Sequence, residues 1–546
     1  MKIKMLKRTM CLLLAGVLLS GCAQSTGSKS KDLEKGQVAA ESSGDNESKI
    51  SDKEITVSFL LMDSPTQPLK NFAPAQQEIF KRTNIKMDYQ IVPSSSYKDK
   101  KSILLGTNNF PDIAYLQNME DVVTYGSTGI LEPLTQYINE ETMPNFYKFW
   151  QEYPEMKKFL LDGELYVFPV IARDESANGF GPVIRKDLLE KHNIESPKTF
   201  DELLDVLVQL KEIYPDSIPW TGRNGTNQLL KTTAYMLGSG YGNSGMYYDY
   251  DVNGGSYVFG PASSNFKEVL SYLNKAFTLG VLDPEFATTT AEQFESKLSS
   301  GRSFFYLDNS GFGQNYTQSL RKLDGLQDAT MQVLPILENA FGQNRAVSYA
   351  KDIAGRFYAV NASAKNKEEI IQLIDWLYSK EGSDISNYGV EGESFEYNEA
   401  GEPEFKQDFV MQYKDAQPSA YYSIYSDLGI TKLNFSLWAM NTRTWFEIEK
   451  LIGNWDEVSD EYWTIINNDQ AYTQPYIDPP FTAEESEKIK EITIDLTTML
   501  EQEYNKFIMD VEPIENWDKV IEKAEEMGVR ELEQIYNDAN KRANEL

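Results

Sequence analysis

Short strand-like runs alternate with helix-like runs in the first part of this chain. Residues 54–62 and 85–92 alternate apolar and polar side chains, the two-residue period of a half-buried strand. Residues 75–82 and 98–106 have the character of helices. A chain that alternates in this way packs its helices against a mostly parallel sheet, so the pattern predicts an α/β fold. In such a sheet, ligands bind beyond the carboxyl ends of the strands.

Residues 162–211 form the most informative single stretch. Asp162-Gly163 is a tight-turn dipeptide, and residues 165–170 form a short apolar and aromatic run that predicts a strand. Thr199 is followed three residues later by Glu202, which is the spacing of a helix capping box. An apolar stripe then keeps helical spacing and predicts an amphipathic helix; its members are Phe200, Leu203, Leu204, Val206, Leu207 and Leu210.

The order of these elements resembles the extracellular solute-binding proteins of ATP-driven sugar importers, and in particular their large lipoprotein branch from Gram-positive bacteria. The motifs that carry this resemblance are Pro111-Asp112-Ile113, Tyr166-Val167-Phe168-Pro169, Lys186–Lys191, Pro197–Leu203, Gly280–Glu285 and Tyr388–Phe395. The resemblance implies a two-lobed periplasmic-binding-protein-like fold with a hinge and a helix-rich C-terminal part. It also implies a non-catalytic carrier that captures an oligosaccharide and delivers it to ABC permease subunits in the membrane. We expect a monomer.

The resemblance further divides the chain into segments. Residues 1–21 are expected to be a signal peptide and residues 22–53 a lipidated tether. Residues 54–168 together with 355–395 are expected to form the first lobe. Residues 169–354 together with 396–546 are expected to form the second lobe.

The N-terminus has the pattern of a bacterial lipoprotein leader. Four basic residues precede a short apolar run over residues 11–19, and Leu19-Ser20-Gly21-Cys22 fits a lipobox. This pattern predicts cleavage before Cys22, lipidation of that cysteine and anchoring at the extracellular face of the membrane; the alternative is an ordinary secretory signal. Residues 24–52 are polar and charged and predict a solvated tether. Because the only other cysteine is Cys11, the mature fold has no disulfide and no cysteine-based site.

The charge balance narrows the classes of ligand. The formal net charge is −31, and loss of the four basic leader residues makes it −35. This balance argues against a nucleic-acid ligand and against a polyanionic glycan, unless a local basic patch overrides it. No long apolar segment follows residue 19, so the sequence predicts no transmembrane helix in the mature protein.

The sequence offers little support for catalysis. Its single histidine, His192, lies in a polar turn with no identifiable partner, and the common hydrolase and phosphate-loop motifs are absent. With 83 acidic residues, a carboxylate pair at glycosidase spacing arises by chance, so a glycosidase or lyase is the alternative function. A surface sensor or adhesin without a transport partner is a third possibility.

We also expect no cofactor and no metal. Many members of the resembled family have a calcium loop after the helix that corresponds to residues 200–211. Here residues 214–220 contain one carboxylate, Asp216, whereas a calcium site needs six to eight oxygen ligands.

Sugars are held by aromatic platforms and by planar polar side chains, which are expected in loops that follow strands at the lobe interface. For the polar candidates the alternative is a solvated loop position, and for tryptophans it is core packing. Trp438 is the predicted main platform, whereas Trp376 lies on a helical apolar stripe and is expected in the core. The candidate ligand contacts are Asp63, Ser64, Gln67, Gln117, Asn118, Arg173, Asp174, Glu175, Trp220, Arg223, Asp308, Asn309, Trp438, Asn441 and Arg443.

Overall fold

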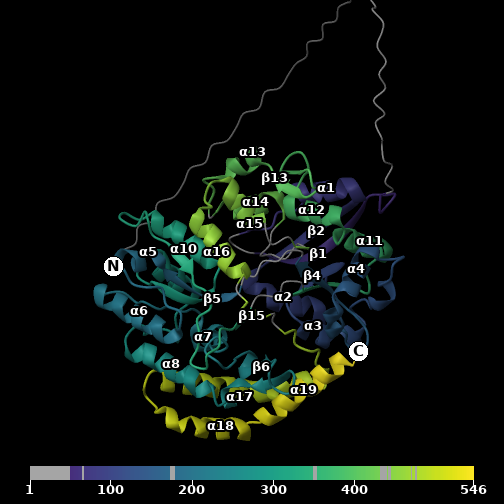
Figure 1. Cartoon of the computed structure of the whole chain (residues 1–546). Helices are drawn as coiled ribbons and strands as arrows, with labels where there is room; N and C mark the ends of the chain where they lie inside the picture. The colour runs from purple at the N-terminus through teal and green to yellow at the C-terminus, as the bar shows by residue number, and fades with distance from the viewer. Residues whose placement is uncertain are drawn as a thin grey trace, which may run out of the picture. The chain divides into compact units, whose positions relative to one another are not determined.

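Two separate sheets organise the protein, whose structure is a computed structural model (Figure 1). The larger sheet has six strands in the order β14-β4-β11-β3-β1-β2, and a second sheet has three strands in the order β8-β5-β9. The structure describes residues 49–63, 67–172, 179–347, 353–417, 419–430, 439–440, 444–468, 470–473 and 476–545.

The six-stranded sheet belongs to the first lobe. Its strands are β1 (Ile55–Asp63), β2 (Ile85–Pro93), β3 (Ile113–Leu116), β4 (Phe168–Ala172), β11 (Ile353–Val360) and β14 (Ala439–Met440). The helices with it are α1 (Pro74–Thr83), α2 (Ser94–Gly106), α3 (Met119–Tyr125), α4 (Pro144–Glu152), α11 (Lys367–Leu377), α12 (Lys380–Tyr388), α13 (Gln407–Val410), α14 (Ala420–Leu428) and α15 (Thr444–Leu451).

The pairing in this sheet confirms the predicted α/β character and refines it. Strand β1 pairs in parallel with β2 and with β3, as the alternating pattern predicts. Strand β11 instead pairs antiparallel with both β3 and β4. The reason is the path of the chain: β11 re-enters the first lobe beside the end of β4, where Ile353 pairs with Ile171, so it must run back in the opposite direction.

The three-stranded sheet lies at the centre of the second lobe. Its strands are β5 (Phe180–Arg185), β8 (Phe305–Asn309) and β9 (Met331–Val333), and both of its pairings are antiparallel. The helices of this lobe are α5 (Lys186–His192), α6 (Phe200–Ile213), α7 (Gly225–Thr233), α8 (Phe266–Thr278), α9 (Ala291–Ser299), α10 (Phe312–Arg321), α16 (Glu457–Asn468), α17 (Ala483–Ile508), α18 (Trp517–Glu526) and α19 (Val529–Asn544). Two-stranded ladders join β6 (Met246–Asp249) to β7 (Ser256–Phe259), β10 (Ala346–Val347) to β15 (Tyr472–Thr473) and β12 (Phe395–Tyr397) to β13 (Pro403–Phe405).

Alternation along these strands separates two packed faces of the second lobe. Ile184 and Phe305 belong to a large core that includes α6 and α8, whereas Val183 and Tyr306 belong to a smaller core on the other face. Successive side chains of a strand point to opposite faces, so a sheet covered on both sides needs apolar residues at every position. This is why Val183-Ile184 of β5 and Phe305-Tyr306-Leu307 of β8 are continuous apolar runs.

The capping box predicted from the sequence begins α6. The Thr199 hydroxyl accepts a hydrogen bond from the Glu202 amide at 3.1 Å, and the Glu202 carboxylate accepts one from the Thr199 amide at 3.3 Å. The two groups satisfy amides that the first helical turn would otherwise leave unpaired. The apolar stripe that follows is buried, as its spacing predicts.

The helix-rich C-terminal part completes the second lobe. In Figure 1 the yellow helices α17, α18 and α19 lie along α8 and β6. Leu496, Leu500 and Tyr504 of α17 and Trp517 of α18 are buried in the large core of this lobe. The Trp517 indole also donates a hydrogen bond to the Pro261 carbonyl at 3.0 Å. Among the helices that the structure describes, none combines the length and the apolar character needed to cross a bilayer.

One predicted boundary differs from the observed packing. The sequence assigned residues 396–546 to the second lobe, but Phe405, Ile424, Ile448 and Ile452 pack in the core of the first lobe. These four apolar residues lie at the end of β13, on α14, on α15 and directly after α15. They belong to the same core as residues of β1 and β4. The assignment of the described residues between 396 and 452 to the second lobe is therefore wrong, and the described chain passes to the second lobe only before α16. Trp376 packs against the first core, as predicted, and is half-buried.

Glu447 provides a pH-dependent test of this packing. Burial raises its pKa from 4.5 to about 7, although the Phe405 amide donates to its carboxylate and opposes the shift. When the pKa of a carboxyl group is higher in the folded state than in the unfolded state, the free energy of unfolding falls as the pH rises from the unfolded-state pKa to the folded-state pKa. We therefore expect Glu447→Gln to gain stability relative to the wild type between pH 4.5 and 7, by on the order of 2 kcal/mol.

Urea unfolding measured across this pH range checks the prediction. The control is Glu396→Gln, because Glu396 is exposed on β12 and its substitution should change the unfolding free energy little. Parallel stability profiles for the wild type and Glu447→Gln would show that Glu447 is not desolvated.

Candidate functional site

A cavity of about 700 Å³ lies between the two lobes. The first lobe contributes residues at the carboxyl end of β3, at the end of the 3-10 helix η3 (Pro154–Phe159) and on β11. The second lobe contributes the segment 476–481 and one side of α17. The main lining residues are Asn118, Met119, Glu120, Phe159, Ile353, Phe357, Asn243, Ser244, Tyr476, Ile477, Asp478, Phe481, Ile489, Lys490, Thr493 and Tyr536.

An aromatic stack forms part of the second-lobe wall. The rings of Tyr476 and Tyr248 are parallel, with centroids 3.5 Å apart and an interplanar angle of 4°. The Lys158 ammonium of η3 lies 3.5 Å from the centroid of the Tyr476 ring. Burial acts to raise the pKa of Tyr476, but hydrogen bonding and the positive charge of Lys158 outweigh it, so the pKa is lowered. This cation–π contact joins the two lobes at the edge of the cavity.

Asp478 is the most unusual ionisable group in this cavity. Its residue is solvent-exposed, yet desolvation by the surrounding protein raises the pKa of its carboxyl group. The Tyr257 hydroxyl donates a hydrogen bond to Oδ1 at 2.7 Å, and this bond and the positive charges of Lys231 and Lys158 only partly oppose the shift. An accessible carboxyl group with a perturbed pKa inside a cavity is typical of functional sites.

Two predicted contacts, Arg223 and Asp308, meet at the end of β8. The Arg223 guanidinium donates two hydrogen bonds to the Asp308 carboxylate, Nε to Oδ2 and Nη2 to Oδ1, each at 2.9 Å. Asp308 is buried, whereas about a quarter of the Arg223 side chain is exposed and its guanidinium lies 5.0 Å from the Phe312 ring centroid. The pair is 85 residues apart in sequence, so the fold brings it together. Neighbouring Asn309 accepts a hydrogen bond from the Gly311 amide at 2.9 Å and shapes the turn before α10.

The other described candidates lie at the carboxyl ends of β1 and β3. Asp63 accepts a hydrogen bond from the Leu69 amide at 2.8 Å, which closes the loop after β1, and Gln67 in that loop is buried. Gln117 is half-buried, and its amide oxygen accepts a hydrogen bond from Lys101 at 3.5 Å. Asn118 is exposed. Among the candidate contacts that the structure describes, it is the one that lines the inter-lobe cavity. Ser64, Arg173, Asp174, Glu175, Trp438, Asn441, Arg443 and Cys22 lie outside the described residues.

Trp220 is not a cleft residue, contrary to the prediction. Its side chain is fully buried in the core of the second lobe, where its ring centroid lies 5.4 Å from that of Phe305 and 6.3 Å from that of Tyr272. Although the residues that follow it are polar and rich in glycine, Trp220 itself forms backbone bridges to Leu282 and to Phe305. Burial in the extended connection beside β8 therefore overrides the local composition.

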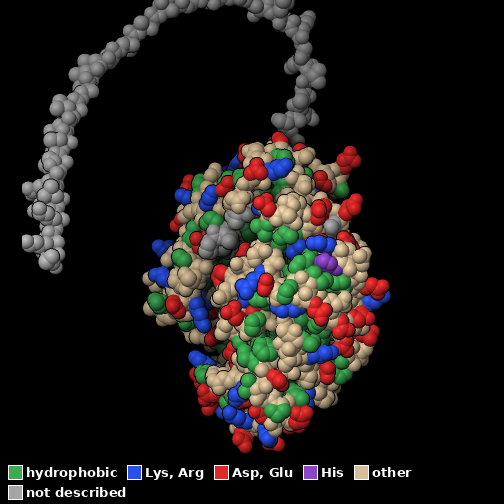
Figure 2. Space-filling model, turned by 90° about the vertical axis from the view of Figure 1, so that its left-hand side faces the viewer, with side chains coloured by type: hydrophobic (Ala, Val, Ile, Leu, Met, Phe, Trp, Pro, Cys, Tyr) green, Lys and Arg blue, Asp and Glu red, His purple; other side chains and the backbone are tan. Residues whose placement is uncertain are grey.

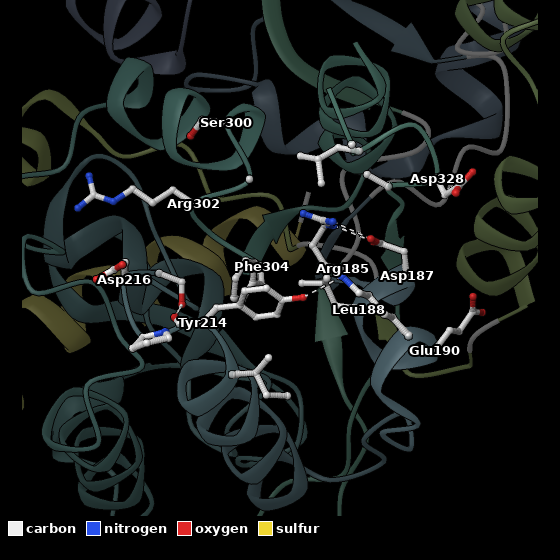
Figure 3. A pocket seen from close by; sticks show the side chains of 18 residues that line it. Arg185, Asp187, Leu188, Glu190, Tyr214, Asp216, Ser300, Arg302, Phe304 and Asp328 are labelled. Atoms are coloured by element: carbon white, nitrogen blue, oxygen red, sulfur yellow. Dashed lines mark hydrogen bonds and ion pairs between the residues drawn. The ribbon is translucent and has the colours of Figure 1, made fainter. Parts of the chain in front are cut away.

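A second cavity, of about 830 Å³, lies within the second lobe (Figure 3). Arg185 and Asp187 point toward each other at its centre, and Tyr214, Phe304 and Arg302 line one side. Arg185, which lines this cavity, is the last residue of β5. Phe180 is the first residue of β5, and it pairs with Asn309 beside Asp308. The second cavity is therefore at the opposite end of the sheet from the Arg223–Asp308 pair.

Residues 214–217 line this second cavity, and they belong to the loop for which the sequence predicts no calcium site. Asp216 lines it, and no cluster of three or more metal-ligating side chains occurs among the residues that the structure describes. His192 lies nearby, where its Nε2 atom is 2.9 Å from the Tyr214 hydroxyl. Acidic and basic side chains are interspersed over the face that carries His192, shown in purple in Figure 2.

Sequence reasoning missed Asp478 and Tyr476. Both lie in the run Tyr476-Ile477-Asp478-Pro479-Pro480-Phe481, which the sequence analysis included only in a helix-rich remainder. Two adjacent prolines exclude a helix there, because proline lacks the amide donor and restricts the residue before it. A proline-restricted connection that carries two aromatic rings and a carboxylate is a sequence feature from which this wall of the cavity could have been predicted.

The two-lobed arrangement with an inter-lobe cavity is that of a ligand-binding protein. Residues 63–384 match the family model described as bacterial extracellular solute-binding protein, which covers more than half of the chain. The chain belongs to this family.

Curated relatives of the chain extend over most of its length. It is 25% identical over 508 residues to the polygalacturonan/rhamnogalacturonan-binding protein YtcQ of Bacillus subtilis, which covers 90% of this chain and 92% of the relative. It is also 25% identical over 362 residues to the fructooligosaccharide ABC transporter substrate-binding protein FusA of Streptococcus pneumoniae, covering 63% of this chain and 64% of the relative.

Solved structures share the fold. The alginate-binding protein AlgQ2 without calcium ion superposes with a TM-score of 0.70 at 20% identity, covering 90% of this chain and 99% of that one. An extracellular solute-binding protein from Bifidobacterium longum subsp. infantis gives a TM-score of 0.71 at 17% identity, covering 91% and 99%. These similarities confirm the predicted two-lobed α/β fold.

The Arg223–Asp308 pair predicts a measurable contribution to stability. Asp308→Asn removes the charge that neutralises a partly buried guanidinium, which should lower the unfolding free energy by about 2 kcal/mol. The matched control is Asp201→Asn, because Asp201 forms an exposed ion pair with Lys275 at 3.3 Å. Exposed pairs contribute less than about 1 kcal/mol. The unfolding free energies are measured by urea unfolding. An equal decrease in the two variants would contradict the prediction that the buried pair stabilises the fold more than the exposed pair.

Proposed function

We propose that this protein is a lipid-anchored substrate-binding protein of an ABC transporter, which captures an oligosaccharide between its lobes and delivers it to the membrane permease. The observation that carries this proposal is the inter-lobe cavity. It combines aromatic rings, such as Phe481 and Tyr536, with polar groups at Asn118 and Asp478. Apolar sugar faces pack on rings and sugar hydroxyls bond to amide and carboxylate groups, so the cavity has both kinds of contact that a glycan needs.

The relatives support the class of ligand. YtcQ is named for polygalacturonan and rhamnogalacturonan binding, and FusA for fructooligosaccharide transport. Both names refer to oligomeric or polymeric sugars. A cavity of about 700 Å³ can hold several sugar units and is larger than a single small solute needs.

A carrier role fits this site better than glycan cleavage. Hydrolysis requires a general acid and a second carboxylate in fixed positions on the two sides of a sugar bond. Asp478 is one carboxyl group with a raised pKa, and the other acidic residue that lines the cavity, Glu120, is exposed at the start of α3. Incubation of the protein with a bound glycan should therefore return the glycan intact.

The lipid anchor rests on the lipobox that ends at Cys22. Two acyl chains hold a protein stably on a membrane, whereas one chain binds only marginally. Cells that express the full chain should therefore retain it in the membrane fraction, and Cys22→Ser should release it. Delivery to a permease would explain why a glycan-binding protein is held at that surface.

A thermal-shift screen of glycans and dipeptides tests the proposed ligand class. A ligand that binds only the folded state stabilises it by RT ln(1 + [L]/Kd), or about 2.7 kcal/mol at one hundred times Kd. We expect at least one oligosaccharide to raise the melting temperature, with no effect of the dipeptides. A shift with dipeptides and with no glycan would overturn the assignment.

Small-angle scattering tests whether the lobes close on the ligand. Hinge motion is the usual way in which two-lobed binding proteins enclose a solute. We expect a smaller radius of gyration when a glycan identified by the screen is present at saturation. An unchanged radius for a protein that binds that glycan would contradict hinge closure.

Trp438 remains the predicted main stacking platform. Trp438→Ala should weaken glycan binding by about 1–3 kcal/mol, the scale of a buried aromatic contact. The control is Trp376→Ala, because Trp376 packs against the first core and should affect the melting temperature rather than the affinity. Unchanged affinity of folded Trp438→Ala in calorimetry would remove this residue from the site.

A further inference from the structure

The charges that line the inter-lobe cavity are few and mostly negative. Of the described residues that line it, Glu120 and Asp478 are acidic and Lys490 is basic. Asp478 projects from the second-lobe wall between the aromatic residues Tyr476 and Phe481 of the same connection.

The Asp478 carboxylate is only partly satisfied by the protein. Its Oδ1 atom accepts the hydrogen bond from Tyr257, which lies on β7. Within the described ranges no protein group donates to Oδ2, and the residue is exposed to solvent. A carboxylate oxygen can accept hydrogen bonds but can donate none while it is ionised, so its natural partner is a hydroxyl group.

The two cations whose charges act on Asp478, Lys158 and Lys231, already have other partners. The Lys158 ammonium lies over the Tyr476 ring at 3.5 Å, and Lys231 donates to the Asn243 side chain at 3.2 Å. Lys158 and Lys231 therefore offer little to neutralise an anionic ligand beside Asp478; the basic residue of the described lining, Lys490, lies on α17.

We propose that the sugar unit held beside Asp478 is uncharged, and that Asp478 is the residue that discriminates against uronic acids there. This inference rests on the proposed glycan-binding function and narrows its substrate class to neutral oligosaccharides. A neutral sugar donates a hydroxyl hydrogen to Asp478. A uronic acid places a second carboxylate beside it in a partly desolvated cavity, where like charges repel.

The raised pKa of Asp478 has the same physical origin. Desolvation in this cavity disfavours a negative charge even in the absence of a ligand. Discrimination against acidic sugars should therefore weaken as the pH falls through the raised pKa of Asp478, because protonation removes the repulsion. It should be strongest at neutral and alkaline pH, where Asp478 is ionised.

A matched set of glycans tests the proposal by calorimetry at pH 7.5. The probes are kestose as a neutral oligosaccharide, tetragalacturonic acid as an acidic one, and the methyl ester of tetragalacturonic acid, which has the same chain without the charge. We expect each neutral probe that binds to bind at least about tenfold more tightly than tetragalacturonic acid, which corresponds to about 1.4 kcal/mol. Tighter or equal binding of the free acid would overturn the inference.

Substitution of Asp478 gives the second arm of the test. Asp478→Asn removes the charge and retains an acceptor, so we expect the preference for neutral probes to fall below about threefold, mostly through tighter binding of the acid. Tyr257→Phe removes the hydroxyl donor but keeps the carboxylate, so it should retain the preference. Glu484→Gln, at an exposed position of α17 that is not part of the cavity lining, is the matched charge control and should also retain it. An unchanged preference in folded Asp478→Asn would assign the discrimination to another residue.

The outcomes separate this inference from the proposed function. Failure of every oligosaccharide in the thermal-shift screen to bind would refute glycan binding itself, and the inference with it. Glycan binding with a preference for the acidic probe would leave the carrier function intact and overturn only the neutral substrate class.

Discussion

The separation of the buried apolar side chains into two lobes is the constraint on which the rest of the structure depends. The first core surrounds the six-stranded sheet, and two further cores cover the faces of the three-stranded sheet. Along the described residues, the chain leaves the first lobe after β4, returns at β11 and leaves again before α16. Each lobe is thus completed by segments that are far apart in sequence. The surface between the lobes is free to hold polar and aromatic groups, because it does not have to supply a core of its own.

Among the described residues, the contacts that join the lobes are both polar and aromatic; the Phe446 ring of α15 and the Trp463 ring of α16, for example, have centroids 4.6 Å apart. Lys158 of η3 lies on the Tyr476 ring, and Gln318 of α10 donates to the Glu449 carboxylate of α15 at 3.0 Å. Arg321 pairs with Asp456 at 2.9 Å, just before α16 begins. Partly exposed ion pairs and hydrogen bonds each contribute little free energy. These polar contacts therefore resist a change in the relative position of the lobes only weakly.

Local patterns predicted much of the fold. The strand periods of β1 and β2, the capping box of α6 and the apolar stripe of α6 are properties of short segments, and each is found where the sequence places it. Packing between distant segments was not predictable in the same way. The described apolar side chains between residues 396 and 452 suit either core by composition, and only their packing in the same core as β1 and β4 assigns them to the first lobe.

The candidate site was predicted less completely than the fold. Polar residues near the ends of β3 and β8 were predicted because loops at strand ends carry ligand contacts. Asn118 lines the inter-lobe cavity, whereas Arg223 and Asp308 pair with each other and are not among its described lining residues. Trp220 was misplaced because its polar neighbours are backbone-paired beside a core strand. Asp478 was missed because its significance depends on desolvation by the surrounding protein, which no sequence period encodes.

Hydrogen exchange with and without a bound oligosaccharide is the most direct test of the central claim that the cavity between the lobes is the glycan site. The amides of residues 116–123 and of 476–481 lie on opposite walls of that cavity, in different lobes. The account predicts that a glycan identified by thermal shift slows exchange in both segments together. Protection confined to residues 185–191 and 213–217, around the second cavity, would contradict it.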